Sequence, residues 1–403
     1  MERYFRTNDL AVGYHGSVLI HDISISIEKG KILTLIGPNG AGKSTVLKTI
    51  TRHLAAIGGT VYFGRRKLYD LSPRELAQQV AVMLTDRIRP ELMTCSEIVA
   101  LGRYPYTNAL GRLTAEDREI VRRALQRVDA LELADRDFST LSDGQRQRIM
   151  LARAICQQPE VIVLDEPTAY LDIRHKIELL NILREMAHDN GITVIMSLHE
   201  IDLAAKISDQ LLFVKGDTIA GFGRPDEIFE GDTVNRLYDI EHGSYNALLG
   251  SVELTRPQGE PQVFVVGGGG HGVPVYRALQ KQQIPFAAGI LFDNDVDYQV
   301  ARGLSDNVVT APAFEPMTGQ HYDAAAGLLC RCGMVIDAGT PLGTFNQMNG
   351  RLLELAARRG IPIQKGCSII QPDNDQGVTE SNAAESIEAA ESIEVGETIE
   401  AGE

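Results

Sequence analysis

The sequence predicts an α/β protein with two folded units, each built around a largely parallel sheet. Short apolar runs rich in β-branched residues alternate with helical patterns, as in ILTLIG (32–37), VIVLDE (161–166) and VFVVG (263–267). Such alternation is typical of strands that lie parallel and are connected by helices. The chain has 403 residues, which exceeds one ordinary domain, so we expect more than one core.

The first unit is expected over residues 1–254. Its buried strands are predicted at 32–37, 161–166, 193–199 and 210–216. The opening stretch differs, because LAVGYHG and ISISIE alternate apolar and polar residues more strictly. That alternation favours an additional antiparallel sheet with one exposed face.

A second α/β unit is expected over residues 263–370. The preceding stretch TRPQGEPQ (255–262) has two prolines and a glycine and predicts a linker. After VFVVG, further strands are predicted in FAAGILF, NVVTAP, MVIDAG and IPIQ, alternating with helices. This pattern indicates a small Rossmann-like sheet.

Residues 371–403 are predicted to be a disordered acidic tail. They repeat the units ESIEAA, ESIEVG and ETIEAG and hold two Asp, eight Glu and no Lys or Arg. The stretch has few large apolar residues, so burying them would not compensate for the conformational entropy lost on folding. The whole chain carries −15 at pH 7, which leaves −5 for the rest. A folded body with that charge has no basic footprint, so no nucleic-acid partner is expected.

Apolar runs and cysteines predict the compartment. No run approaches the roughly 20 residues of a membrane span, and the start MERYFRTNDL does not resemble a secretory signal. Five scattered cysteines suit reduced thiols, so we expect the cytoplasm. Cys330 and Cys332 flank one arginine; they fit either a metal-binding pair or, as we favour, small buried apolar side chains.

A phosphate-binding loop follows the first buried strand. GPNGAGKST (37–45) satisfies G-x-x-x-x-G-K-[ST] between a strand and a helical pattern. The glycines let backbone amides turn inward onto phosphate oxygens, Lys43 supplies charge to the terminal phosphates, and the Ser44 hydroxyl is placed to bind Mg²⁺. The expected ATP-binding residues of the loop are Gly37, Pro38, Asn39, Gly40, Ala41, Gly42, Lys43, Ser44 and Thr45.

Two adjacent carboxylates follow the apolar run VIVL. Asp165 is expected to hold the Mg²⁺ shell, and Glu166 is expected to polarise the attacking water. An acidic turn without a catalytic role is the alternative, but the nearby phosphate loop favours the catalytic interpretation. The sequence therefore predicts nucleotide hydrolysis with ATP and Mg²⁺.

With LSDGQRQR (141–148) added, residues 1–254 resemble the nucleotide-binding subunit of an ATP-binding cassette (ABC) transporter. The resemblance implies a P-loop NTPase fold with an antiparallel β-subdomain and a helical subdomain. It implies a homodimer in which this signature meets the ATP held by the opposite subunit. Asp143 stands where the family usually has glycine. The signature residues expected to act in trans are Ser142, Asp143, Gly144 and Gln145.

Three further residues take their expected roles from the same resemblance. Tyr14, ahead of the phosphate loop, resembles the aromatic residue on which adenine stacks. Asp172, in YLD, resembles the acid of the segment that communicates between the two sites. His199, after the run TVIMSL, resembles the switch histidine that contacts the γ-phosphate. His199 therefore joins Glu166 and Lys43 as an expected catalytic residue.

The resemblance also implies partners and a location. We expect two integral membrane permease subunits, an indirect link to an extracytoplasmic substrate-binding protein, and attachment to the cytoplasmic face of the membrane. TCSEIVALGRYPYTNALGRLTAED (94–117) resembles a segment in ATPases of iron-siderophore, haem and cobalamin importers. Within it, Tyr104, Pro105 and Tyr106 are expected to contact the membrane subunit, the alternative being a turn with surface aromatics.

The chain departs from the family pattern after VAVML (80–84). The family has a glutamine there that reaches both the metal-bound water and the membrane subunit, whereas this chain has Thr85 and Asp86. Thr85 takes the glutamine position. Either its hydroxyl or the Asp86 carboxylate is expected near Mg²⁺, and the spacing leaves both alternatives open.

The second unit has a glycine turn of its own. Gly267, Gly269 and Gly272 match G-x-G-x-x-G between a strand and a helical pattern, and Asp293 follows the next strand. One interpretation is a regulatory domain that holds a nucleotide or an anionic metabolite at the turn, with Asp293 on a hydroxyl. The other is a tight turn without a ligand.

Together the motifs predict the ATP-hydrolysing subunit of an ABC importer for iron-siderophore, haem or cobalamin. One alternative is a soluble ABC ATPase that acts on protein or nucleic acid; the single cassette and the lack of a basic patch argue against it. Another alternative is an ATPase fused to a nucleotide-dependent redox domain.

Overall fold

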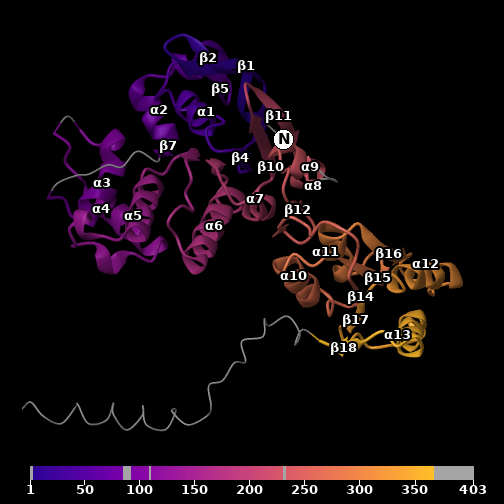
Figure 1. The fold of residues 1–403 in the computed structure, drawn as a ribbon. Coiled ribbons are helices and arrows are strands. Elements are labelled where there is room, and N and C mark those ends of the chain that lie inside the picture. The colour runs from indigo at the N-terminus through magenta and orange to yellow at the C-terminus, as the bar shows by residue number, and fades with distance from the viewer. Residues whose placement is uncertain (1–2, 85–91, 109, 230–232, 367–403) are drawn as a thin grey trace, which may run out of the picture. The chain divides into compact units, whose positions relative to one another are not determined.

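The computed structural model describes residues 3–84, 92–108, 110–229 and 233–366 (Figure 1). Contacts separate the chain into two compact units, residues 1–252 and residues 253–403. Each unit has its own sheets and its own hydrophobic cores. The predicted acidic tail, 371–403, lies outside the described residues.

A six-stranded sheet in the order β11-β10-β4-β9-β8-β7 forms the centre of the first unit. The strands from β10 to β7 run parallel, and β11 adds an antiparallel edge. Every residue of β4, β8 and β9 is buried, which explains their uninterrupted apolar runs. The strands are β4 (Ile32–Ile36), β7 (Val80–Met83), β8 (Val161–Leu164), β9 (Thr193–Ser197), β10 (Gln210–Lys215) and β11 (Thr218–Gly223).

One face of the parallel sheet shares a core with helix α1 and an antiparallel sheet. The antiparallel sheet has the path β2-β1-β5-β6, with β3 paired to β1, and this confirms the second sheet predicted from the alternating start of the chain. These elements are β1 (Arg3–Tyr14), β2 (Ser17–Ile23), β3 (Ser26–Glu28), α1 (Lys43–Ile50), β5 (Gly58–Phe63) and β6 (Arg66–Lys67).

The other face packs against helices, including those of a helical subdomain. Three of its helices begin with a capping box, in which Thr94, Thr114 or Ser142 exchanges hydrogen bonds with the residue three positions later. Besides α1, the described helical elements of the first unit are η1 (Leu68–Asp70), α2 (Pro73–Gln79), α3 (Cys95–Ala100), η2 (Leu101–Tyr106), α4 (Ala115–Arg127), η3 (Leu131–Leu133), η4 (Phe138–Thr140), α5 (Asp143–Cys156), α6 (Ile173–His188), α7 (Ile201–Ile207), α8 (Pro225–Ile228) and α9 (Thr233–Leu237). A short hairpin of β12 (Ser244–Asn246) and β13 (Ser251–Glu253) comes next.

Packing explains why Gly102 and Arg103 follow one another in the helical subdomain. A Cβ on Gly102 would lie 2.4 Å from the backbone oxygen of Arg153, so only glycine fits there. Arg103 is buried and donates to Asp117 at 2.9 Å and to the backbone oxygen of Cys156 at 3.0 Å. Its guanidinium also lies 4.1 Å from the ring centre of Tyr106. This buried ion pair therefore joins η2 to the start of α4 and the end of α5.

The second unit is a five-stranded parallel sheet in the order β16-β15-β14-β17-β18. In chain order this is 3-2-1-4-5, the order of a doubly wound sheet, with a switch point between β14 and β17. Separate cores lie on the two faces, one with α10 and α11 and one with α12 and α13. The elements are β14 (Val263–Val266), α10 (Val273–Lys281), β15 (Phe286–Phe292), α11 (Val296–Leu304), β16 (Asn307–Ala311), α12 (Gly319–Leu329), β17 (Met334–Asp337), α13 (Gln347–Arg359) and β18 (Ile363–Lys365).

The segment predicted as a linker, 255–262, is hydrogen-bonded within the second unit. The backbone oxygen of Thr255 accepts from Gln280 at 3.1 Å, and the Gln262 amide donates to the backbone oxygen of Pro285 at 2.8 Å. Just before it, the buried carboxylate of Glu253 pairs with Arg277. The second unit therefore begins before residues 255–262. Their proline and glycine content predicts a linker, but the segment packs as part of the second unit.

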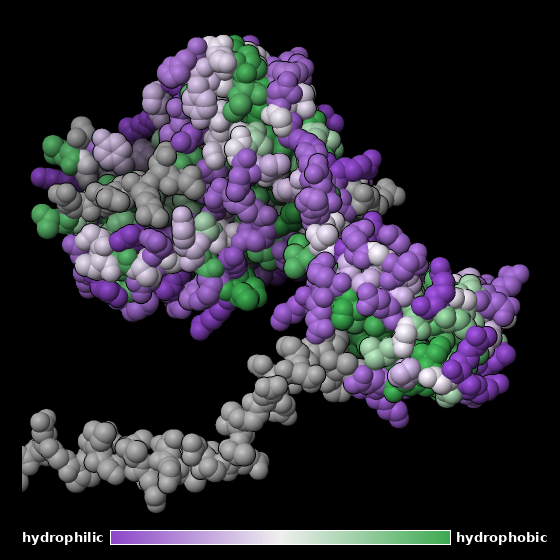
Figure 2. All heavy atoms as spheres, in the orientation of Figure 1, coloured by the Kyte–Doolittle hydropathy of each residue, from purple (hydrophilic) through white to green (hydrophobic). Residues whose placement is uncertain are grey.

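Polar residues cover most of the visible surface, with apolar residues in small groups (Figure 2). No helix among the described residues combines the length and the hydropathy that a bilayer span needs. Of the two cysteines predicted to be buried, Cys332 is buried, whereas Cys330 is exposed. Within the described part of the chain, no group of three or more His, Cys, Asp or Glu side chains could hold a metal ion.

Candidate active site

The phosphate loop connects β4 to α1 through three glycines with positive φ. These are Gly37 (147°), Gly40 (77°) and Gly42 (94°). A Cβ on Gly37 would lie 2.1 Å from the backbone oxygen of Val214, so this position requires glycine for space as well as for conformation. The loop therefore has the backbone that a phosphate cradle needs.

Lys43 lies at the first position of α1 and is buried. Its Nζ donates to the backbone oxygens of Gly37 at 2.8 Å and Pro38 at 3.0 Å, which closes the loop around the ammonium group. Burial lowers the pKa of Lys43, and the carboxylates of Glu166 and Asp165 act in the opposite direction. The loop thus holds a desolvated cation beside two acids, where an anionic phosphate gains most from it.

The two acids at the end of β8 are held by a residue that the motifs did not reveal. Ser197, the last residue of β9, donates its hydroxyl to Asp165 Oδ1 at 2.7 Å and accepts from the Glu166 amide at 2.9 Å. Asp165 is only 2% exposed. The available sequence signal for Ser197 is a polar residue directly after the apolar residues Val194, Ile195 and Met196.

Glu166 and His199 meet at the mouth of the site. His199 Nε2 lies 2.6 Å from Glu166 Oε1, and Glu166 has φ 51°. A positive φ in a non-glycine residue costs free energy and is common at functional sites. The strand ends of β8 and β9 therefore bring together the acid expected to polarise the attacking water and the histidine expected to contact the γ-phosphate.

Most residues of the expected ATP site line one hollow of about 480 Å³. Tyr14 stands at its rim, 46% exposed, with its hydroxyl 3.2 Å from Thr45 Oγ1. Leu19 lines the hollow beside it and was not expected from the sequence. The lining residues are Tyr14, Leu19, Asn39, Gly40, Gly42, Lys43, Ser44, Thr45, Glu166 and His199.

The signature residues lie apart from this hollow, at the start of α5. Ser142 caps the helix: its Oγ accepts from the Gln145 amide at 3.3 Å, and Gln145 Oε1 accepts from the Ser142 amide at 3.1 Å. Asp143 pairs with Arg146 at 3.2 Å, and Gly144 lies within the first turn. Ser142, Asp143, Gly144 and Gln145 are all at least partly accessible.

The side chain of Gln147 connects the signature helix to the acidic loop. Gln147 Nε2 donates to the backbone oxygen of Pro167 at 2.7 Å. Asp172, the expected acid of the communication segment, caps α6 by accepting from the His175 amide at 2.9 Å, and this bond lowers the pKa of Asp172. Thr85 and Asp86, the two alternatives for the missing glutamine, lie outside the described residues.

The glycine turn of the second unit is filled by the protein's own carboxylates. Asp297, fully buried, accepts from the amides of Gly272 at 2.8 Å and Val273 at 3.0 Å, and also from Gly268. Asp295 accepts from the Gly269 amide at 2.7 Å. These oxygens occupy four amides of the turn and the helix start, so an anion at Gly267, Gly269 and Gly272 would compete with them.

Packing explains why that turn is rich in glycine. A Cβ on Gly267 or on Gly272 would lie 2.5 Å or 2.4 Å from the hydroxyl of Tyr276, which is fully buried in α10. Asp293, expected on a ligand hydroxyl, instead accepts from the Ala313 amide at 3.0 Å. The interpretation of a tight turn without a ligand therefore fits the structure better than the ligand-binding interpretation.

Comparisons with known proteins identify the family. Residues 20–169 match the ABC transporter family, and residues 286–400 match a family described as the MJ0874 family. The chain is 42% identical over 287 residues to an uncharacterized ABC transporter ATP-binding protein, MJ0873, of Methanocaldococcus jannaschii, covering 71% of this chain and 99% of that protein. The chain belongs to the ATP-binding proteins of ABC transporters and is an ATPase of that type, as the motifs predict.

Other relatives carry importer names. The iron(3+)-hydroxamate import ATP-binding protein FhuC of Bacillus subtilis is 38% identical, covering 58% of this chain and 87% of that protein. The cobalamin import ATP-binding protein BtuD of Halobacterium salinarum is 32% identical, covering 73% of this chain and 75% of that protein. Among solved structures, the ADP conformation of the ATP-binding cassette MJ1267 matches 59% of this chain and 97% of its own, with 27% identity and a TM-score of 0.52.

Substitution of Lys43 tests the phosphate loop. We expect Lys43→Ala to weaken ATP binding at least tenfold, because a charge-assisted hydrogen bond contributes about 1.5–3 kcal/mol. Titration calorimetry with the full chain measures this. Lys48→Ala, further along α1, is the control and should bind ATP normally. Unchanged affinity in Lys43→Ala would show that the loop assignment is wrong.

Proposed function

We propose that this chain is the ATP-hydrolysing subunit of an importer for an iron-siderophore, haem or cobalamin. The observation that carries the proposal is the meeting of the phosphate loop with Glu166 and His199 in one hollow. The hydroxamate and cobalamin importers named among the relatives support the cargo class. These relatives are transporter subunits, so the comparisons do not favour a soluble, non-transport ATPase.

Hydrolysis requires a base, a phosphate clamp and a metal site. Glu166 accepts a proton from the attacking water, Lys43 neutralises the terminal phosphates, and His199 holds the γ-phosphate. The Ser44 hydroxyl and the Asp165 carboxylate are oxygen donors of the kind that Mg²⁺ prefers, so the residues present fit this ion. Bound there, Mg²⁺ would supply positive charge to the phosphate oxygens. The Ser197 hydroxyl keeps the Asp165 carboxylate in place.

A homodimer would complete the site. The accessible start of α5 carries Ser142 outside the hollow, so within one chain the signature has no nucleotide to contact. In a head-to-tail dimer, the Ser142 hydroxyl and the amino terminus of α5 would face the ATP held by the other copy. A helix of 14 residues provides the dipole that favours an anion there.

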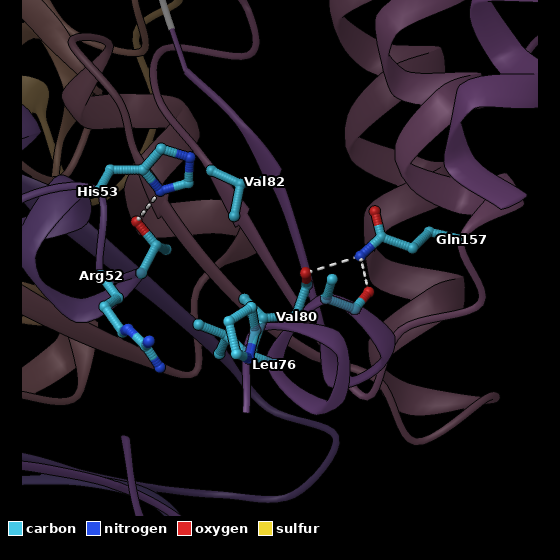
Figure 3. Close-up of a pocket in the computed structure, with 9 residues that line it drawn as sticks. Arg52, His53, Leu76, Val80, Val82 and Gln157 are labelled. Atoms are coloured by element: carbon cyan, nitrogen blue, oxygen red, sulfur yellow. Dashed lines mark hydrogen bonds between the residues drawn. The ribbon is translucent and has the colours of Figure 1, made fainter. Parts of the chain in front are cut away.

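A groove formed by the residues after α1, by α2 and by β7 is the proposed contact for the membrane permease. It has a volume of about 360 Å³ and is lined by side chains that include Arg52, His53, Leu76 and Val82 (Figure 3). Gln157 closes one side by donating to the backbone oxygen of Val80 at 2.7 Å (Figure 3). Such a mixed groove suits an amphipathic segment of a partner.

The tyrosines of η2 lie next to α2 and α5. Tyr106 donates its hydroxyl to the backbone oxygen of Gln157 at 3.0 Å, so it is anchored to the groove wall rather than free at the surface. Tyr104 is 74% exposed and Leu101 is 48% exposed. We therefore propose that Tyr104 and Leu101 extend the membrane-subunit contact beyond the groove, with Tyr106 as a support. Through this contact the chain would bind peripherally at the cytoplasmic face.

The second unit is proposed to regulate the ATPase rather than to catalyse a reaction. Its glycine turn holds carboxylates instead of a cofactor phosphate, which argues against the fused redox enzyme. A ligand of this unit could alter transport only by binding differently to the open and closed forms of the dimer.

Glu166→Gln tests the base. The variant should lose turnover by roughly a hundredfold or more while keeping ATP affinity, because only the proton acceptor is removed. Phosphate release and nucleotide titration measure the two properties, and size-exclusion chromatography with ATP should show a stable dimer. Glu178→Gln on α6 is the control. Normal turnover in Glu166→Gln would remove this residue from the role.

Uptake in cells tests the cargo. Deletion of the gene should abolish uptake of one compound among a radiolabelled ferric hydroxamate, haem and cobalamin. The wild-type chain should restore it and Glu166→Gln should not, because transport needs hydrolysis. Unchanged uptake of all three compounds would contradict the importer proposal, while leaving the ATPase assignment intact.

Truncation tests the regulatory role. A chain that ends after Leu254 keeps β13 and every residue that lines the hollow. We expect its basal turnover to match that of the full chain, because every residue that lines the hollow belongs to the first unit. Loss of turnover in a truncated chain with a native circular dichroism spectrum would show that the second unit belongs to the ATPase core.

A further inference from the structure

Glu200 follows the switch histidine and stands at the start of α7, but it does not cap that helix. It occupies the N-cap position, and its side chain makes no capping hydrogen bond to α7. Instead its carboxylate reaches across to the chain that follows the catalytic acid. Oε2 accepts from Thr168 Oγ1 at 3.0 Å, and Oε1 accepts from Lys176 Nζ at 2.6 Å.

The two bonds tie together three segments around the active site. Thr168 lies two residues after Glu166, is 2% exposed, and forms part of the turn in which the Ala169 amide donates to the backbone oxygen of Glu166. Lys176 lies in the first turn of α6, and its amide donates to the backbone oxygen of Asp172. Glu200 therefore connects the loop after the base, the communication helix and the switch strand.

The spacing places this cluster in register with the catalytic pair. His199 contacts Glu166 at 2.6 Å, and the next residue, Glu200, contacts Thr168. The two chain segments thus meet twice, at adjacent residues of one segment and at residues two apart in the other. Because Glu200 and His199 share one planar peptide, fixing the backbone of Glu200 restricts the positions open to His199.

The charges of the cluster are partly shielded from water. The side chains of Lys176 and Glu200 are 24% and 31% exposed. Burial alone would raise the pKa of Glu200, but the hydrogen bonds from Lys176, its own backbone amide and Thr168 outweigh burial and leave the pKa lowered. Glu200 is therefore a carboxylate at neutral pH, and its pair is less screened than a surface ion pair.

We propose that Glu200 is a positioning residue for His199, held in place by Lys176 and Thr168. The proposal rests on the function proposed above, in which His199 acts on the γ-phosphate. The cluster fixes the start of α7 against the loop of Glu166 and so sets the position of the imidazole. It also gives α6, which begins just after Asp172, a direct mechanical link to the switch histidine.

Kinetics of the full chain test the proposal. Glu200→Gln keeps the volume and loses the charge, and Lys176→Met removes the cation. Each should lower kcat between about tenfold and a hundredfold, the size of effect that a misplacement near 1 Å produces, with the KM for ATP changed less than about twofold. The double variant should lose no more than the worse single variant, since the two residues form one pair.

Two further variants separate positioning from general stability. Lys176→Arg retains the cation and should restore most of kcat. Lys206→Met removes a comparable pair, with Asp202, from the exposed side of α7 and should leave kcat unchanged. A thermal unfolding curve for each variant confirms that the measured chains are folded. Normal kcat in folded Glu200→Gln and Lys176→Met would overturn the proposal.

A last comparison separates this proposal from the function on which it rests. In a His199→Gln background, measured by single-turnover hydrolysis, adding Glu200→Gln should cause no further loss. An equal loss in both backgrounds would show that Glu200 acts independently of His199 and would overturn the proposal alone. Wild-type turnover in His199→Gln itself would contradict the assigned role of His199, and the positioning proposal with it.

Discussion

The site depends on the parallel pairing of β4, β9 and β8. Neighbouring parallel strands end at the same edge of a sheet, so the loops that leave these ends are forced together. Leu35 of β4 pairs with Ser197 of β9, and Met196 of β9 pairs with Leu164 of β8. The phosphate loop, the switch histidine and the acid pair come directly after these positions. No long-range loop folding is needed to assemble them.

Hydrogen bonds between these neighbouring loops then fix the positions of the reacting groups. Ser197 uses one hydroxyl to hold the Asp165 carboxylate and the backbone amide of Glu166, and Gln147 connects the signature helix to the loop after Glu166. These contacts are made by residues of ordinary type at strand ends and on a helix face. They serve as the outer layer that holds the reacting groups at a defined spacing.

Sequence patterns predicted the first unit well because its signals are local. A strand, a glycine loop and Lys43 are contiguous, so spacing alone defines their structure. The roles of Ser197 and Glu200 were not predictable, because their partners, Asp165 and Lys176, are distant in sequence and become neighbours only through the sheet. The glycine pattern of the second unit left its two interpretations open because Asp297, whose carboxylate contacts the turn, comes after a different strand. A pattern of glycines describes a backbone shape but not the group that occupies it.

The filled turn of the second unit also sets a condition on any ligand. Asp295 and Asp297 are tethered to the sheet beside the amides that they contact, so their local concentration is far above that of a free metabolite. An incoming phosphate would have to displace a buried carboxylate and leave it without its three amide donors. Competition of this kind would disfavour a phosphate at this glycine turn.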